Sequence, residues 1–246
     1  MKKILEAKNI SKSYDNIKII NNINIDLYEG ELVCILGTSG VGKTTLFNIL
    51  SGLLLPDTGE VLLNNHNIVG TPGKISYMLQ KDLLFSHKKI IDNVSLPLVI
   101  NGKDKKKARE LSKPYFKQFG LDNCEDKYPA QLSGGMRQRA ALLRTYLGSN
   151  GVSLLDEPFS ALDALTKRDM HLWYQKVMLE IGLSTIFITH DIDEAILLSD
   201  RILVMSNKPG EIVLELNINH PKPRHNNFTL NQEFLNYKKQ ILDVLI

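Results

Sequence analysis

The chain has 246 residues, 43% of them apolar, with a formal charge of +3 at pH 7. Such a chain is long and apolar enough for one globular unit with a substantial core and an inserted subdomain. Its small net charge disfavours a strongly basic surface for nucleic acid or lipid, and its two cysteines, Cys34 and Cys124, do not make a disulfide framework. They are instead typical of a reducing compartment.

The N-terminal segment predicts neither a signal peptide nor a membrane anchor. Its first acid, Glu6, comes too early for a signal peptide, and no stretch of the chain approaches the ~18 apolar residues of a membrane span. Leu5 to Leu27 mixes β-branched and polar residues around Asp15 and Asn16, which predicts antiparallel strands joined by a turn. A role at a membrane would therefore require a partner.

A glycine-rich loop follows the next strand. The nearly continuous apolar run at 31–36 predicts a strand buried on both faces, and Thr44 to Leu50 begins a helix that Gly52 closes. In this spacing the backbone N–H groups cradle phosphates, Lys43 reaches the terminal ones and the Thr44 hydroxyl holds Mg²⁺. The predicted nucleotide-binding residues are Gly37, Thr38, Ser39, Gly40, Val41, Gly42, Lys43, Thr44 and Thr45.

The rest of the chain alternates strands and helices, as an α/β core does. The interval from Lys81 to Asn150 differs, because it predicts helices, including Lys103 to Phe119 and Gly135 to Leu147, and no strand. It is therefore interpreted as an inserted helical subdomain. The lysines at 103–107 are interpreted as a solvated helix face, with a nucleic-acid or lipid patch as the alternative. The later strands are expected at 60–63, 75–79, 152–156, 185–189, 201–205 and 211–216.

A second glycine motif stands at 132–139, with the sequence Leu-Ser-Gly-Gly-Met-Arg-Gln-Arg. Its residues Ser133, Gly134 and Gly135 open a helix and offer bare backbone donors at the positive end of the helix dipole. This arrangement suits the γ-phosphate of a nucleotide. Gln138, in the same motif, is included among the nucleotide-binding residues.

Two acids end the buried-strand run at 152–156. Asp156 and Glu157 emerge at the carboxyl edge of the sheet, where α/β proteins place their ligands. In the P-loop arrangement the first acid binds Mg²⁺ through water and the second polarises the attacking water. The alternative is a helix N-cap followed by a solvated acid.

Together these motifs resemble the ATPase subunit of an ABC transporter, from Tyr14 to His190 and on through the C-terminal tail. The resemblance implies a P-loop NTPase (RecA-like) core with an antiparallel β subdomain, spanning 1–80 and 151–220. It also implies a helical subdomain at 81–150 and a tail at 221–246, all within one domain. The tail begins with a proline-rich polar segment at 220–227, interpreted as a loose, extended linker to a final helix. ATP and Mg²⁺ are the implied substrate and metal.

The resemblance also gives roles to residues that the pattern alone leaves open. It assigns His190 to the γ-phosphate, Gln80 to Mg²⁺ and to a loop that touches the membrane subunit, and Tyr14 to stacking on adenine. Ser160 and Asp163 match the loop through which two ATPase subunits communicate. The alternatives are a structural histidine at a strand end, a tyrosine packed in the core and a plain helix cap.

The implied mechanism needs two chains arranged head to tail. ATP lies between 37–45 of one subunit and 133–138 of the other. Lys43 and Mg²⁺ neutralise phosphate charge, while Ser133 and Gly135 donate from the partner. Glu157 activates water and His190 steadies the γ-phosphate.

The segments 157–166 and 189–195 resemble importers of nitrate, sulfonates, taurine and thiamine-pyrimidine precursors. This implies membrane permease subunits, an extracytoplasmic solute-binding protein, a position on the cytoplasmic face of the membrane, and no nucleic-acid partner. The chain departs from this subgroup at 85–88, where Phe-Ser-His-Lys stands in place of a region that usually carries Pro-Trp. An exporter ATPase, a non-transport ABC ATPase acting on ribosome or nucleic acid, and a P-loop kinase are the competing interpretations.

Overall fold

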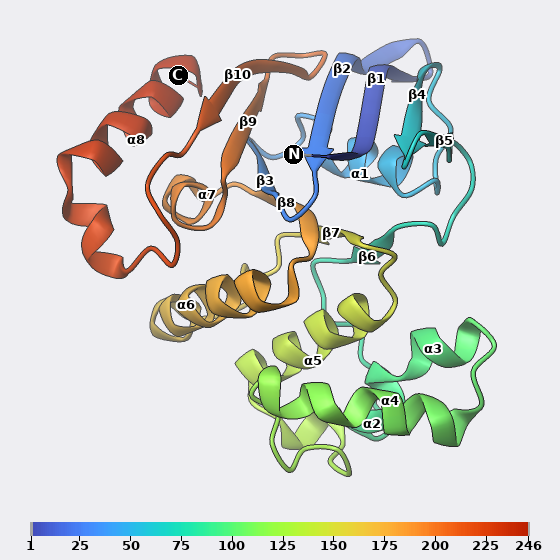
Figure 1. Cartoon of the computed structure of the whole chain (residues 1–246). Coiled ribbons are helices and arrows are strands. Elements are labelled where there is room, and N and C mark those ends of the chain that lie inside the picture. Colours follow the sequence, from blue (N-terminus) through green and yellow to red (C-terminus); the bar gives the residue numbers. More distant parts are fainter. Residues whose placement is uncertain (1, 246) are drawn as a thin grey trace.

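The computed structural model describes residues 2–245, with the exception of the Asn226 side chain. It is a mixed α/β fold, as predicted from the sequence (Figure 1). The strands are β1 (Lys3–Tyr14), β2 (Ile17–Tyr28), β3 (Leu32–Gly37), β4 (Thr58–Leu63), β5 (His66–Asn67), β6 (Ser76–Met78), β7 (Val152–Asp156), β8 (Ser184–Thr189), β9 (Arg201–Ser206) and β10 (Glu211–Asn217). The helices are α1 (Lys43–Leu50), α2 (Ile90–Val94), α3 (Leu96–Ile100), α4 (Lys105–Gln118), α5 (Gly134–Leu147), α6 (Ala164–Ile181), α7 (Ile192–Leu198) and α8 (Gln232–Leu245), with short 3₁₀ helices η1 (Pro129–Gln131) and η2 (Asn226–Leu230).

The N-terminal strands form an antiparallel sheet in the order β2-β1-β4-β5. β1 and β2 pair across the turn at Asp15 and Asn16, both of which have positive φ, as short polar turn residues tolerate. One face of this sheet packs its apolar residues against β3 and α1, and these residues belong to one buried cluster. The antiparallel strands expected between Leu5 and Leu27 are confirmed.

The central sheet carries the nucleotide motifs. Its order is β10-β9-β3-β8-β7-β6, with β9, β3, β8, β7 and β6 parallel and β10 antiparallel at the edge. β3, β7 and β8 are buried along their whole length, which agrees with their continuous apolar sequences. Because the strands are parallel, the loops after β3, β6, β7 and β8 all leave from the same edge of the sheet.

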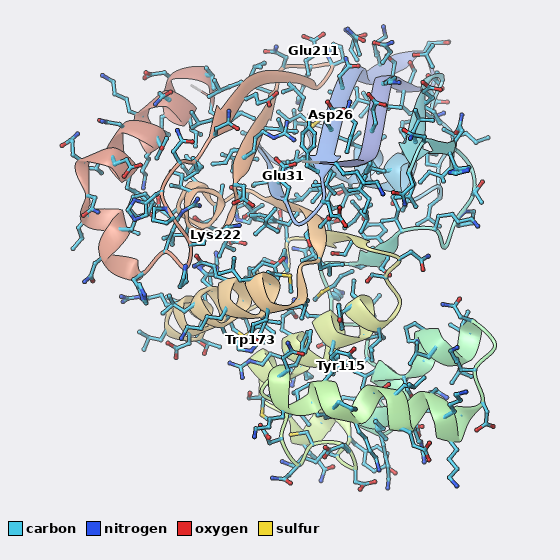
Figure 2. The ribbon with its side chains drawn as sticks, viewed as in Figure 1. Asp26, Glu31, Tyr115, Trp173, Glu211 and Lys222 are labelled. Carbon is cyan, nitrogen blue, oxygen red and sulfur yellow. The ribbon has the colours of Figure 1, made fainter. Side chains whose placement is uncertain are left out.

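Helices α2 to α5 form a separate region beside this edge of the sheet, shown in green in Figure 1. The interval from 81 to 150 holds these helices and η1, and no strand occurs there among the described residues. An aromatic seam joins this region to α6, because Trp173 packs edge-on against Phe119, with ring centroids 5.8 Å apart. Figure 2 shows Trp173 on α6 and Tyr115 on α4 close to this seam.

The C-terminal tail differs from the loose linker expected from its prolines. Arg224 is only 2% exposed and is among the largest fully buried side chains. Its guanidinium donates to the carbonyls of Ile196, Ser199, Ile218 and His220, and its backbone pairs with the Gln175 side chain. The amino-acid composition of this segment did not predict the buried arginine, because an arginine among polar residues is normally exposed to solvent. α8 then packs against α7 and β10 (Figure 1).

Within residues 2–245, the structure contains no helix with the length and apolar character needed to cross a membrane.

Candidate active site

The glycine-rich loop connects β3 directly to α1. Gly40 and Gly42 have φ of +80° and +107°, a conformation that glycine adopts without strain. Gly42 also leaves no room for a side chain, because a Cβ there would lie 2.5 Å from Cγ2 of Ile20. α1 begins at this glycine with no side-chain cap and no acid in its first turn, so its N-terminal amides and positive dipole are open to an anion.

Lys43 is held inside this loop. It is 7% exposed, and its Nζ donates to the carbonyl oxygens of Gly37 and Thr38 at 2.8 and 2.9 Å. Burial lowers the pKa of Lys43, while the nearby carboxylates of Glu157 and Asp156 act in the opposite direction. An ammonium group has three donors, so Lys43 retains one for a phosphate. The neighbouring residues Thr38, Ser39, Gly40 and Thr44 are exposed.

Asp156 is the last residue of β7. Its Oδ2 accepts a hydrogen bond from the Tyr77 hydroxyl at 3.3 Å, and the Tyr77 ring packs edge-on against Phe47 of α1. Burial raises the pKa of Asp156, and the charge of Glu157 adds to this effect. A cation beside this carboxylate would therefore be favourable.

Glu157 is the point at which three loops converge. Its φ is +45°, an uncommon value for a non-glycine residue, and its amide donates to the carbonyl of Ile188 on β8. His190 Nδ1 lies 2.9 Å from its Oε1, and Gln80 Nε2 donates to its Oε2 at 3.0 Å. Gln80 also reaches the Ser160 hydroxyl at 3.3 Å. The sequence-predicted Gln80, Glu157, Ser160 and His190 are thus brought together.

These side chains line a cleft of about 800 Å³ between the sheet edge and the helical region. Gly134, at the start of α5, lies on the same wall. The alternative in which Asp156 and Glu157 cap a helix does not hold, because the next described helix, α6, begins only at Ala164.

Helix α5, which carries the glycine motif at 132–139 and is called the signature helix from here on, begins at Ser133, whose hydroxyl accepts from the Met136 amide at 3.3 Å. Ser133 and Gly134 are exposed, and the first amides of α5 have no partner within the helix. Gly135 is buried, and a Cβ at this position would lie only 3.2 Å from Cγ2 of Thr166 on α6. The second glycine therefore allows α5 and α6 to approach closely.

Gln138 is not part of this exposed surface. It is 4% exposed and its Nε2 donates to the carbonyl of Pro158. Its side chain therefore joins α5 to the loop after Glu157 within the same subunit, and it lines the same cleft as Gly134, so its contact with a nucleotide stays a prediction.

Tyr14 lies at the end of β1 and is 46% exposed, so the alternative of a tyrosine packed in the core does not hold. The ring has Lys12 Nζ 5.7 Å from its centroid. An exposed aromatic face at this position is available for stacking on a base.

Two further helices begin beside the cleft with aspartates. Asp163 caps α6 by accepting from the amides of Leu165 and Thr166, and Asp191 caps α7 by accepting from the amide of Glu194. Asp163 is thus the helix cap that the sequence analysis gave as the alternative to a role in communication between subunits, and that role stays a prediction. The contacts of Lys167 behind these two caps were not predicted. Lys167 Nζ contacts Asp191 Oδ2 at 2.7 Å and Glu194 Oε2 at 2.9 Å.

The residues present fit a magnesium nucleotide. The open end of α1 and the third donor of Lys43 suit phosphate oxygens. The Thr44 hydroxyl, the Gln80 amide oxygen and the Asp156 carboxylate are hard oxygen donors of the kind that Mg²⁺ prefers. No cluster of three or more His, Cys, Asp or Glu suited to a metal occurs in the described part of the chain.

Comparison with known proteins agrees with this geometry. The ABC transporter family model matches residues 20–160. The chain is 41% identical over 249 residues to the formylaminopyrimidine import ATP-binding protein ThiZ of Halalkalibacterium halodurans, covering 100% of this chain and 98% of the relative.

Two solved structures share the fold. One is a dimeric ATP-binding cassette in a post-hydrolysis state bound to ADP and Pi, with a TM-score of 0.74 and 29% identity over 89% of this chain and 100% of the other. The second is cbiO1 from Clostridium perfringens, part of the ABC transporter complex cbiONQ, with a TM-score of 0.81 and 27% identity over 98% of this chain and 100% of the other. With the glycine loop, the paired acids and the signature helix all in place, the chain belongs to the ABC transporter family as an ATP-binding ATPase.

Proposed function

We propose that this ATPase works as a head-to-tail pair of identical subunits and powers the permease of an importer for a small solute. The observation that carries the proposal is the convergence of Gln80 and His190 on the carboxylate of Glu157, with Ser160 bonded to Gln80, in a cleft whose wall includes the start of α5. Ser133 and Gly134 are exposed at the start of α5. In the proposed pair their backbone amides bind the γ-phosphate of the ATP held by the other copy.

In this proposal the residues of the candidate site have the following roles in hydrolysis. Lys43 and the α1 amides bind phosphate oxygens, and the exposed Tyr14 ring stacks on adenine. Glu157 accepts a hydrogen bond from the attacking water and orients it, and His190 donates to the γ-phosphate. Thr44, Gln80 and, through water, Asp156 would hold Mg²⁺, which would supply positive charge beside the phosphates. The Ser160–Asp163 loop contacts the other subunit and couples the conformations of the two sites.

Substitution of the central carboxylate tests this assignment. Glu157→Gln removes the charge that polarises water but keeps the shape of the side chain, so ATP binding is retained and turnover is abolished. Because the nucleotide is not consumed, the variant accumulates as an ATP-bound dimer. Phosphate release and size-exclusion chromatography with MgATP measure both results.

The matched control is Glu110→Gln, the same change on the exposed surface of α4, which leaves turnover normal. A Glu157→Gln protein with near-normal hydrolysis would remove Glu157 from the catalytic role.

The permease is proposed to contact a groove of about 410 Å³ between the segment after β6, α3 and α5. Several apolar side chains on its rim are solvent-exposed, as expected for a surface that a partner covers. They are Leu79, Leu83, Phe85 and Ile100. Contact with a permease here places the chain at the cytoplasmic face of the membrane, with an extracytoplasmic solute-binding protein as an indirect partner.

The import direction and solute class rest on the likeness to ThiZ, which is a formylaminopyrimidine import protein. We propose a solute of the thiamine-pyrimidine-precursor type, or of the related nitrate, sulfonate and taurine type. Tagged Glu157→Gln protein, purified with ATP from solubilised native membranes, tests the partner by mass spectrometry. Recovery of a multi-span permease and a solute-binding protein supports import. Recovery of ribosomal or nucleic-acid partners alone would overturn the transporter assignment and leave the ATPase chemistry intact.

A further inference from the structure

The two helices that begin with aspartates follow two different loops of the site. α6 starts immediately after the Ser160–Asp163 loop, and α7 starts at Asp191, the residue next to His190. Lys167, in the first turn of α6, contacts both Asp191 and Glu194. One side chain therefore connects α6, which follows the Ser160–Asp163 loop (the communication loop), with α7, which follows His190.

This connection is more enclosed than an ordinary surface ion pair. Glu194 is 3% exposed, and the Lys167 side chain is 21% exposed. Although burial acts to raise it, the hydrogen bond from Lys167 holds the pKa of Asp191 below its ordinary value. Removing one partner of an enclosed pair is costly, because the other partner remains buried and unpaired. The contact therefore fixes distance and direction between α6 and α7.

Asp191 transmits this restraint to His190. Its Oδ1 accepts from the Glu194 amide and its own amide donates to the Thr189 hydroxyl at 3.1 Å, so the residue is anchored on both sides. The His190 side chain is 57% exposed and contacts Glu157 through Nδ1. The position of this exposed ring thus depends strongly on its backbone, which Asp191 holds.

We propose that Lys167 is a positioning residue for hydrolysis, which couples the Ser160–Asp163 loop to the backbone of His190 through its bonds to Asp191 and Glu194. The proposal rests on the role of His190 given above. When a second subunit moves the communication loop, the first turn of α6 moves with it, and Lys167 carries the displacement to the start of α7. A cavity of about 430 Å³ borders these residues and gives α6 and α7 space to adjust.

Three variants of the full-length protein test the coupling. Lys167→Met keeps much of the apolar stem and removes the charge, Lys167→Arg restores a charged donor, and Asp191→Asn keeps a good helix cap but loses the carboxylate. We expect Lys167→Met to lower kcat about tenfold, since small misplacements of a catalytic group are costly. Its KM for MgATP and its nucleotide affinity stay within about twofold, because the Lys167 ammonium contacts Asp191 and Glu194 and not the glycine-rich loop. Lys167→Arg recovers at least half of kcat.

The double variant separates coupling from general damage. If Lys167 and Asp191 act through one contact, Lys167→Met combined with Asp191→Asn is no slower than the slower single variant. Independent effects that multiply would overturn the proposal, as would a normal kcat in Lys167→Met. Should Lys167→Met fail to fold, Asp191→Asn alone decides, and a normal kcat there overturns the coupling.

A parallel His190→Ala variant distinguishes this inference from the function on which it rests. Normal hydrolysis by His190→Ala would refute the role of His190 and the coupling with it. Loss of hydrolysis in His190→Ala together with normal hydrolysis in Lys167→Met would refute the coupling alone.

Discussion

Four helices begin around the candidate site, and they begin in two different ways. α1 starts at Gly42 without a side-chain cap, and α5 starts at Ser133 with an uncharged one. α6 and α7 instead start at Asp163 and Asp191, whose carboxylates bind the first backbone amides. The first turns of α1, α5 and α6 contain no acid, and that of α7 contains two, so the caps and not the first turns distinguish the two pairs.

This difference separates binding from positioning. A helix N-terminus attracts anions through its free amides and its dipole, and an aspartate cap uses these amides and cancels the positive potential. α1 and α5 therefore remain available to phosphate, while α6 and α7 are closed to it and their caps are available to hold loops in place. At these four helices the residue type at the N-cap thus indicates whether the helix end can bind phosphate or holds a loop in place.

Closing one of the open ends gives the largest expected effect. Ser133→Asp preserves a side chain that caps α5 but adds a negative charge where the partner's ATP is proposed to bind. Two like charges about 4 Å apart repel by about 4 kcal/mol at an effective dielectric constant of ~20, which corresponds to a roughly thousandfold loss of hydrolysis. ATP binding to a single subunit is unaffected. Phosphate release and fluorescent nucleotide titration check the two parts.

Ser133→Asn is the matched control for this change, because asparagine caps a helix about as well and carries no charge. It retains most of the activity. If Ser133→Asp also hydrolysed ATP normally, the start of α5 would not face a phosphate and the comparison between open and closed ends would fail.

The second prediction concerns the C-terminal end of α7, opposite the end that Asp191 caps. This end is covered by Arg224, which donates to the carbonyls of Ile196 and Ser199. Arg224→Met leaves these buried acceptors without a donor and lowers the free energy of unfolding by about 3 kcal/mol. Urea unfolding monitored by circular dichroism measures the loss, and nucleotide affinity stays normal because α1 is untouched.

Lys238→Met is the control in the same tail. Lys238 pairs with Asp193 at 2.7 Å, but both side chains are more than one-third exposed, so the change costs less than about 1 kcal/mol. Equal costs for the two variants would show that Arg224 does not anchor the tail to α7.

The open ends could be predicted from sequence, because local motifs define them. The glycine loop, the paired acids and the Ser-Gly-Gly helix start each lie within eight residues, and the strands that present them were identified from apolar runs. Gln138 belongs to the same local motif, but its direction depends on packing against Pro158, which spacing from Ser133 alone does not give.

The closed ends were only partly predictable. An aspartate before a helix is a recognisable cap, but the partners of Lys167 come from α7, 24 and 27 positions further along the chain. Arg224 likewise finds its acceptors through tertiary contacts, and its polar neighbours favoured a loose linker. Residues that make contacts between helices have no fixed spacing in the sequence. Sequence motifs therefore predict phosphate sites but do not predict networks of positioning residues.

The contact between the closed helices also encloses two groups that titrate in opposite directions. Burial raises the pKa of Glu194 from 4.5 to about 7, and burial beside Lys167 lowers the pKa of His171 from 6.5 to about 4. His171 Nε2 lies 3.9 Å from Glu194 Oε2.

The smallest predicted effect is a pair of opposite pH slopes. Between pH 7 and pH 5 the folded protein binds a proton on Glu194 that the unfolded chain does not, which increases stability, whereas the unfolded chain protonates His171 first, which decreases it. Each contribution amounts to about 2 kcal/mol, and in the native protein they largely cancel. His171→Gln therefore makes the free energy of unfolding rise on acidification relative to the native protein, and Glu194→Gln makes it fall. Urea unfolding at the two pH values measures these slopes, and identical slopes in both variants would show that the contact between α6 and α7 does not enclose a titrating pair.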